Sequence, residues 1–341
     1  MRDLLGTELP LIQAPMAGVQ ASTLALAVGS AGGLGSLPCA MLAPDALRRE
    51  LDALRAAGQP FNLNFFCHTP PPADELRERA WRDALDPYYA ESGLDQHEAP
   101  TATSRVPFNA ITANLVEAYR PAVVSFHFGL PTPELVARVR AWGSKVIASA
   151  TTLAEAQWLE ARGVDAVIAQ GLEAGGHRGH FLSSDHTLQA GTFALVPQLA
   201  RALRVPVIAA GGIADARGVA AAFALGASAV QVGTAYLLCP ETTTHAVHRA
   251  ALADGRAAHT ALTNLFSGGI ARGIVNRLVR ELGPLNPLAP PFPRAASAIA
   301  PLRAHAERNG SGDFSPMWAG QNASGCREIG AAKLTRELAG L

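Results

Sequence analysis

The feature that most restricts how this chain can fold is a regular alternation of short apolar runs with alanine- and leucine-rich stretches. The apolar runs are continuous along their length, which is typical of parallel strands that helices cover on both faces. The runs predict strands at residues 11–14, 35–37, 61–65, 122–126, 145–149, 166–169, 205–209 and 229–232. The stretches between them predict helices at residues 22–30, 44–57, 133–142, 153–161, 192–203 and 216–225.

Eight strand–helix units in succession predict an α/β fold, a TIM (β/α)8 barrel. An additional smaller subdomain is expected from insertions and from the C-terminal region. A doubly wound sheet is the alternative, because the count of strands depends on the weak second run at residues 35–37. The 341 residues are enough for one large domain of this kind.

Two regions interrupt the alternation. Residues 67–108 contain three consecutive prolines and a charged run, and residues 255–325 are rich in proline. Segments this long without the strand–helix pattern usually form lids or small subdomains. We therefore predict residues 1–66 and 109–254 as the barrel, 67–108 as an insertion or lid, 255–325 as a substrate-side subdomain, and 326–341 as a C-terminal helix.

Composition excludes several classes of partner. The formal net charge is zero, so no attraction to nucleic acid or to an anionic membrane surface is expected. Residues 9–44 carry no charged side chain, but glycines interrupt them and they do not predict a membrane span. The first residues lack a cleavable signal pattern, so a cytoplasmic location is expected. The four cysteines are far apart and none forms a C-x-x-C pair, which predicts neither a metal site nor a disulfide. The oligomeric state has no signature in the sequence.

Glycines follow three of the predicted strands. They occur as Gly175-Gly176 in the segment after residues 166–169, as Gly211-Gly212, and as Gly233 before Thr234. Glycine lets backbone amides approach an anion closely, and a following helix N-terminus adds positive potential. Barrels commonly bind phosphate at the loops after their last two strands. The pattern favours a phosphate-bearing cofactor over tight turns that need glycine for geometry alone.

Two histidines are the predicted catalytic residues. His177 follows two glycines, and the charge of neighbouring Arg178 favours a neutral imidazole, which can take a proton from a carbon acid or donate a hydrogen bond to an anion. His127 ends a predicted strand, where barrel enzymes keep catalytic groups; packing between two phenylalanines is the equal alternative. The amides of Gln13 and Asn64, also near strand ends, suit a heterocycle with donors and acceptors.

Several motifs together resemble the nitronate monooxygenases, formerly called 2-nitropropane dioxygenases. They are Gln13-Ala14-Pro15-Met16, Asn62-Leu63-Asn64-Phe65, Glu173-Ala174-Gly175-Gly176-His177, Ala210-Gly211-Gly212-Ile213 and Gln231-Val232-Gly233-Thr234, in the right order over almost the whole chain. Three further segments, residues 86–89, 125–129 and 317–321, resemble the bacterial class I branch. The resemblance implies an FMN-containing TIM barrel that oxidises alkyl nitronates, propionate 3-nitronate among the candidates, with O2 to a carbonyl compound and nitrite.

The strand ends and the resemblance together define a predicted site. Its cofactor-binding residues are Gln13, Ala14, Met16, Asn64, Gln170, Gly175, Gly176, Gly211, Gly212, Gln231, Val232, Gly233 and Thr234. The resemblance also implies that His177 lies beside the flavin. The family often has Ser-Gly-Arg-Pro-Ala-Arg near the substrate, whereas this chain reads Ser267-Gly268-Gly269-Ile270-Ala271-Arg272. Ser267 and Arg272 are therefore the predicted substrate-side residues, and an arginine and a proline are missing between them.

Two other functions fit the same barrel. One is an NAD(P)H-dependent flavin reductase of the quinone or enoyl-ACP type, which would not need a Rossmann glycine motif in such a barrel. The other is an enzyme without flavin that binds a phosphorylated metabolite in the same glycine turns. A purely structural role is disfavoured, because it leaves three glycine-edged strand ends without a ligand.

Overall fold

The computed structural model describes residues 1–96 and 105–341. The predicted strands form one parallel sheet in the order β1-β9-β8-β6-β5-β4-β3-β2. A parallel bridge between Ile12 and Leu34, the residue just before β2, joins the two edges of the sheet and closes the ring. The predicted TIM barrel is thereby confirmed. The strands are β1 (Leu11–Gln13), β2 (Gly35–Pro38), β3 (Phe61–Phe66), β4 (Val123–His127), β5 (Lys145–Ala150), β6 (Ala166–Gln170), β8 (Val207–Ala210) and β9 (Ala229–Val232).

The predicted helices are present with nearly the expected ends. They are α2 (Ser22–Ser30), α3 (Pro44–Ala57), α6 (Pro133–Ala141), α7 (Leu153–Ala161), α8 (Thr192–Ala202) and α9 (Ala216–Ala224). Two of their starts follow directly from the sequence. Pro44 occupies the first turn of α3, and the side chain of Asp215 accepts a hydrogen bond from the Gly218 amide at 2.8 Å to cap α9. The short helices α1 (Arg2–Leu5) and α5 (Ala110–Val116) were not predicted.

Both faces of the barrel strands are buried. Ile12, Ile147 and Ile168 belong to the cluster inside the barrel, whereas Leu11 and Val167 pack in the cluster between sheet and helices. This double burial explains why the strands read as continuous apolar runs. Side chains alternate between the two faces, so the interior row continues at the carboxyl ends into polar residues. Those residues are Asn64, Ser149, Gln170 and Gln231.

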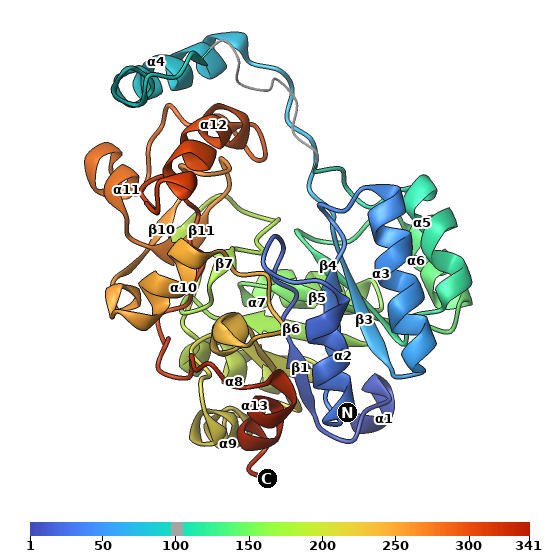
Figure 1. Cartoon of the computed structure of the whole chain (residues 1–341). Helices are drawn as coiled ribbons and strands as arrows, with labels where there is room; N and C mark the ends of the chain where they lie inside the picture. The colour runs from blue at the N-terminus through green and yellow to red at the C-terminus, as the bar shows by residue number, and fades with distance from the viewer. Residues whose placement is uncertain (97–104) are drawn as a thin grey trace.

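The two regions that interrupt the alternation pack against each other. Helix α4 (Glu75–Ser92) comes from the first, and α11 (Arg277–Leu282) and α12 (Ala295–Arg308) from the second. Figure 1 shows α4 lying beside α12, away from the barrel helices. Trp81 and Leu85 of α4 share one apolar cluster with Leu278 and Leu302. The Trp81 indole also donates to the Ala295 carbonyl at 3.3 Å. The division into domains stays a prediction, but these two parts have a common core.

A small antiparallel sheet connects the second of these regions to the barrel. Its strands are β10 (Thr260–Thr263), β11 (Ala271–Ile274) and β7 (Gly176–His177), in the order β10-β11-β7. Helix α10 (Ala246–Ala253) precedes this sheet. The C-terminal helix α13 (Ala331–Leu338) buries Leu334 and Leu338 in the outer core of the barrel. In the part of the chain that the structure describes, no helix is both long and apolar enough to cross a bilayer.

Candidate active site

A cavity opens at the carboxyl ends of the barrel strands, where the interior rows of side chains end. Most of the predicted site residues line it: Ala14, Met16, Asn64, His127, Gln170, Gly175, Gly176, His177, Gly211, Gly212, Gln231, Val232, Gly233 and Thr234. They come from six barrel strands or the loops that follow them. The closed barrel therefore brings together positions that are more than 200 residues apart in the sequence.

Three predicted residues lie outside this lining. Gln13 shares the outward strand face of Leu11, and its amide nitrogen donates to Gln20 Oε1 at 2.7 Å. Arg272 donates from Nε to the Leu172 carbonyl at 2.8 Å, which ties β11 to the loop after β6. Ser267 Oγ lies 2.8 Å from His177 Nε2. Gln13 and Arg272 thus use their polar atoms within the protein and support loops of the site.

The glycine turns after β8 and β9 present free backbone donors. Gly211 and Gly212 have positive φ values of 116° and 75°, which favour glycine. Within residues 1–96 and 105–341, no hydrogen bond uses the backbone N–H of Gly212, Gly233 or Thr234. A Cβ at Gly175 would lie 2.6 Å from backbone atoms of Ala319 and Gly320, so this loop fits only as glycine. Free amides on glycine turns are the usual protein arrangement for an anionic phosphate.

Two side-chain amides supply polar groups deeper in the cavity. The Gln231 Oε1 atom is buried and has no hydrogen-bond partner in the described part of the protein. Asn64 donates from Nδ2 to Ser125 Oγ at 3.0 Å, which fixes the orientation of its side chain. Leaving a buried acceptor unpaired costs about 1–3 kcal/mol, so Gln231 indicates a ligand that donates a hydrogen bond. A planar heterocycle with N–H groups has this chemistry.

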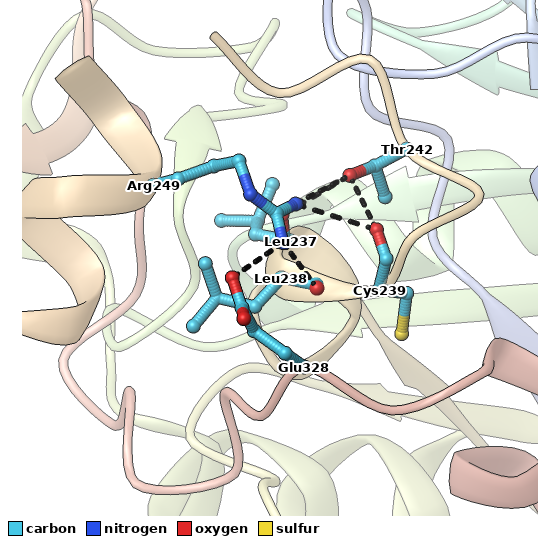
Figure 2. A network of polar contacts seen from close by, with 6 residues as sticks. All are labelled: Leu237, Leu238, Cys239, Thr242, Arg249 and Glu328. Carbon is cyan, nitrogen blue, oxygen red and sulfur yellow. Dashed lines mark hydrogen bonds and ion pairs between the residues drawn. The ribbon is translucent and has the colours of Figure 1, made fainter. Parts of the chain in front are cut away.

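The far end of the short helix after β9 is held from outside the cavity by Arg249. Thr234 begins the short helix η4 (Thr234–Leu238). Figure 2 shows the Arg249 guanidinium between the end of this helix and the C-terminal segment. It donates to the Leu238 carbonyl at 2.8 Å and pairs with Glu328 at 2.9 Å. This network fixes the end of the segment whose first amides face the cavity.

The backbone of His177 is fixed at three points. Strand β7 pairs with β11, which places His177 opposite Ala271. The His177 carbonyl accepts hydrogen bonds from Gln170 Nε2 at 2.9 Å and from His127 Nε2 at 3.1 Å. Gln170 also accepts from the Gly179 amide at 2.7 Å, so both ends of its amide hold this loop. The imidazole is therefore placed by the barrel rather than carried on a loose loop.

The His177 ring lies among aromatic side chains. The ring centroids of Phe292 and Trp318 are 5.1 Å and 5.4 Å from it, and those of Phe66 and Phe128 lie slightly farther away. Burial is the largest cause that lowers the pKa of His177 well below its usual value, and the positive charge of Arg105 adds to it. His177 is consequently a neutral imidazole at neutral pH.

One ring nitrogen of His177 is engaged within the protein. Its Nε2 lies 2.8 Å from Ser267 Oγ, and Ser267 Oγ in turn accepts from the Gly269 amide at 3.3 Å. When Nε2 carries the proton and donates to Ser267, Nδ1 holds the free lone pair. No hydrogen bond to Nδ1 occurs in the described residues. His177 can therefore accept a proton at Nδ1.

His127 supports His177. Its Nε2 donates to the His177 carbonyl, and its Nδ1 accepts from Ser149 Oγ at 3.1 Å. Burial lowers the pKa of His127 to about 4. Both ring nitrogens of His127 form hydrogen bonds that position the loop. Neither nitrogen is free for the catalytic role that was predicted for His127.

The cation that helps to keep His177 neutral is Arg105, not Arg178 as predicted from the sequence. Arg178 is fully buried beneath the loop, where it donates to the carbonyls of Gly171 at 2.6 Å and Gln170 at 2.7 Å. The cation that acts on His177 is Arg105, which lines the cavity. Nothing in the local sequence around Arg105 marks it as a site residue.

Sequence reasoning also missed most of the aromatic wall. Phe66, Phe128, Phe292 and Trp318 surround His177 but come from four separate segments, so only the folded chain brings them together. Phe292 also bears on the departure at Gly269, because a Cβ there would lie 3.1 Å from the Phe292 ring. An arginine at position 269 would therefore need Phe292 to move.

The four cysteines do not form disulfide bonds with one another. All four have free thiols. Burial raises the pKa of Cys239 to about 12, so this thiol is protonated at neutral pH. Among the described residues, no group of three or more histidine, cysteine or acidic side chains could hold a metal ion.

Comparison with known proteins agrees with the geometry. The nitronate monooxygenase family model matches residues 1–339. A nitronate monooxygenase of Pseudomonas aeruginosa is 47% identical over 98% of this chain and 96% of its own length, and one of Paraburkholderia phytofirmans is 44% identical over 98% and 92%. The solved structure of a nitroalkane oxidase from Streptomyces ansochromogenes superposes with a TM-score of 0.91 at 38% identity, covering 99% of this chain and 96% of that one.

A second group of structures shares the fold at lower similarity. FabK from Thermotoga maritima superposes with a TM-score of 0.70 at 30% identity, covering 99% of this chain and 93% of that chain. The family model and both curated relatives span nearly the full length of the chain. On these grounds the chain belongs to the nitronate monooxygenase family.

Proposed function

We propose that this protein is an FMN-dependent enzyme that oxidises alkyl nitronates with O2 to a carbonyl compound and nitrite. The observation that carries the proposal is a half-buried, neutral imidazole at His177, in the same cavity as two glycine turns whose amides have no partner among the described residues. The names of the relatives, nitronate monooxygenase and nitroalkane oxidase, support the same reaction.

The residues of the cavity fit FMN. The amides of Gly212, Gly233 and Thr234 would hold its phosphate, and Gln231 and Asn64 would meet the polar edge of its ring. When bound, FMN supplies the redox chemistry, accepting electrons from the substrate and passing them to O2. The chain contributes placement and electrostatics.

His177 acts on the substrate in one of two ways. For a neutral nitroalkane, Nδ1 takes the proton from the carbon next to the nitro group, while Nε2–H stays on Ser267. A nitronate has already lost that proton, so His177 only orients it. The rings of Phe292 and Trp318 pack against the imidazole and leave an apolar surface for the alkyl tail.

The test is an absorbance spectrum of the purified protein before and after anaerobic mixing with ethyl nitronate. We expect a bound-flavin spectrum that is lost rapidly with the nitronate and slowly with NADH or NADPH. Rapid loss with a reduced nicotinamide, and none with the nitronate, would instead identify a flavin reductase. A colourless protein that stays free of flavin after FMN is added would point to an enzyme for a phosphorylated metabolite.

A further inference from the structure

The cavity contains a cation, Arg105, that no group in the described part of the chain neutralises. Arg105 lines the cavity, and its Nη1 atom is buried without a hydrogen-bond partner. Among residues 1–96 and 105–341, no carboxylate forms an ion pair with Arg105. Arg303, the other arginine of the lining, differs, because its Nε pairs with Glu307 at 2.8 Å.

Arg105 is half-buried, and leaving its buried Nη1 without a partner among the described residues is unfavourable in the protein alone. A buried charge lacks the solvation that water supplies, and it is normally retained where a partner of opposite charge compensates it. Both burial and the nearby charge of Arg303 lower the pKa of Arg105. This shift reflects the same energetic cost of holding a positive charge there. An anion that enters the cavity would remove the penalty, so the geometry indicates an anionic ligand at this position.

Arg105 and His177 flank the same aromatic ring. The Arg105 guanidinium carbon lies 5.4 Å from the centroid of the Phe292 ring, within the range of a cation–π contact. The Phe292 and His177 rings are 5.1 Å apart, and the charge of Arg105 reaches the imidazole. A small ligand that contacts His177 is therefore close enough to interact electrostatically with the charge of Arg105.

The chemistry of the substrate matches this arrangement. A nitronate carries one negative charge shared by two oxygens in a plane, whereas the parent nitroalkane is neutral. A guanidinium presents parallel N–H donors that fit two such oxygens. Building on the proposed function, we infer that Arg105 binds the nitronate group and makes the enzyme selective for the nitronate over the neutral nitroalkane.

The test compares Arg105→Met, which removes the charge but keeps most of the length, with Arg105→Lys, which keeps the charge without the planar fork. Arg162→Met is the matched control, since Arg162 stacks on Trp158 at 3.6 Å outside the cavity. In Arg105→Met we expect the KM for ethyl nitronate to rise roughly 10- to 100-fold, with kcat and bound flavin little changed. Arg105→Lys should be intermediate, and Arg162→Met should match the wild type.

An equilibrium measurement separates this inference from the proposed reaction. Nitrate is planar and singly charged like a nitronate but is not oxidised, and its binding can be followed by the flavin spectrum. We expect the Kd for nitrate to rise roughly 10- to 100-fold in Arg105→Met. A Kd and a KM within about threefold of wild type would overturn the role of Arg105. If the wild type binds nitrate through Arg105 but oxidises no nitronate, the proposed function fails while the anion site stands.

Discussion

Replacing His177 with asparagine should leave bound flavin unchanged and lower kcat/KM for a neutral nitroalkane by roughly 100- to 10,000-fold, the usual range for losing a general base. The reason is that, with Nε2–H donating to Ser267, Nδ1 of His177 is the free acceptor on a ring packed against Phe292. The glycine turns that would hold the cofactor are separate from this side chain. The measurement is steady-state kinetics with nitroethane, combined with the flavin content of each preparation.

The same variant should discriminate between the two forms of the substrate. Ethyl nitronate needs no proton removal, so its kcat/KM should fall only about tenfold, through loss of orientation. His259→Asn is the matched control, because His259 is an exposed histidine outside the cavity. Equal rates of His177→Asn and wild type with both substrates would refute a role for His177 in turnover. Equal losses with both would assign it to orientation alone.

Acidification should destabilise the protein well before its carboxylates protonate. Burial lowers the pKa of both His127 and His248 to about 4, whereas in the unfolded chain each has the ordinary value near 6.5. Between these values the unfolded state binds more protons than the folded state, so the stability falls as the pH falls. At pH 5 each histidine should have removed about 2 kcal/mol from the free energy of unfolding, or about 4 kcal/mol together.

Urea unfolding at pH 7, 6 and 5 measures this effect. His248→Gln removes one titrating group, whose Nε2 has no hydrogen-bond partner among the described residues, and should flatten the pH dependence by up to about 1.4 kcal/mol per pH unit. His259→Gln, at an exposed position, is the control substitution. A free energy of unfolding that is the same at pH 7 and pH 5 would show that these imidazoles are not buried as neutral groups.

The fold was predictable from the sequence because burial on both faces leaves a strong local signal. Ile168 lies inside the barrel and Val167 lies under the helices, so each strand is an apolar run without polar alternation. The barrel closes through the bridge between Ile12 and Leu34. This closure follows from the number of strand–helix units, and no local sequence pattern marks it. Helix α4 was not predicted because it contains Pro87. In addition, its buried residues Trp81 and Leu85 pack against segments distant in the sequence and not against the barrel.

The candidate site was predictable where a residue follows a strand and was not predictable elsewhere. Gly212, Gly233 and His177 are marked by their place after an apolar run. Gln13 also follows one, but the twofold alternation of the strand turns it to the outer face with Leu11. Arg105 reaches the cavity from the region between β3 and β4, and no pattern in that region indicates where its side chain lies.

In the proposed function, backbone amides of the turns after β8 and β9 hold the phosphate of the cofactor. The most direct test is to compare the affinity of the flavin-free protein for FMN and for riboflavin, which has the same ring and no phosphate. If the amides of Gly212, Gly233 and Thr234 bind the phosphate, FMN should bind at least about 100-fold more tightly. Equal affinities for the two flavins would contradict this arrangement.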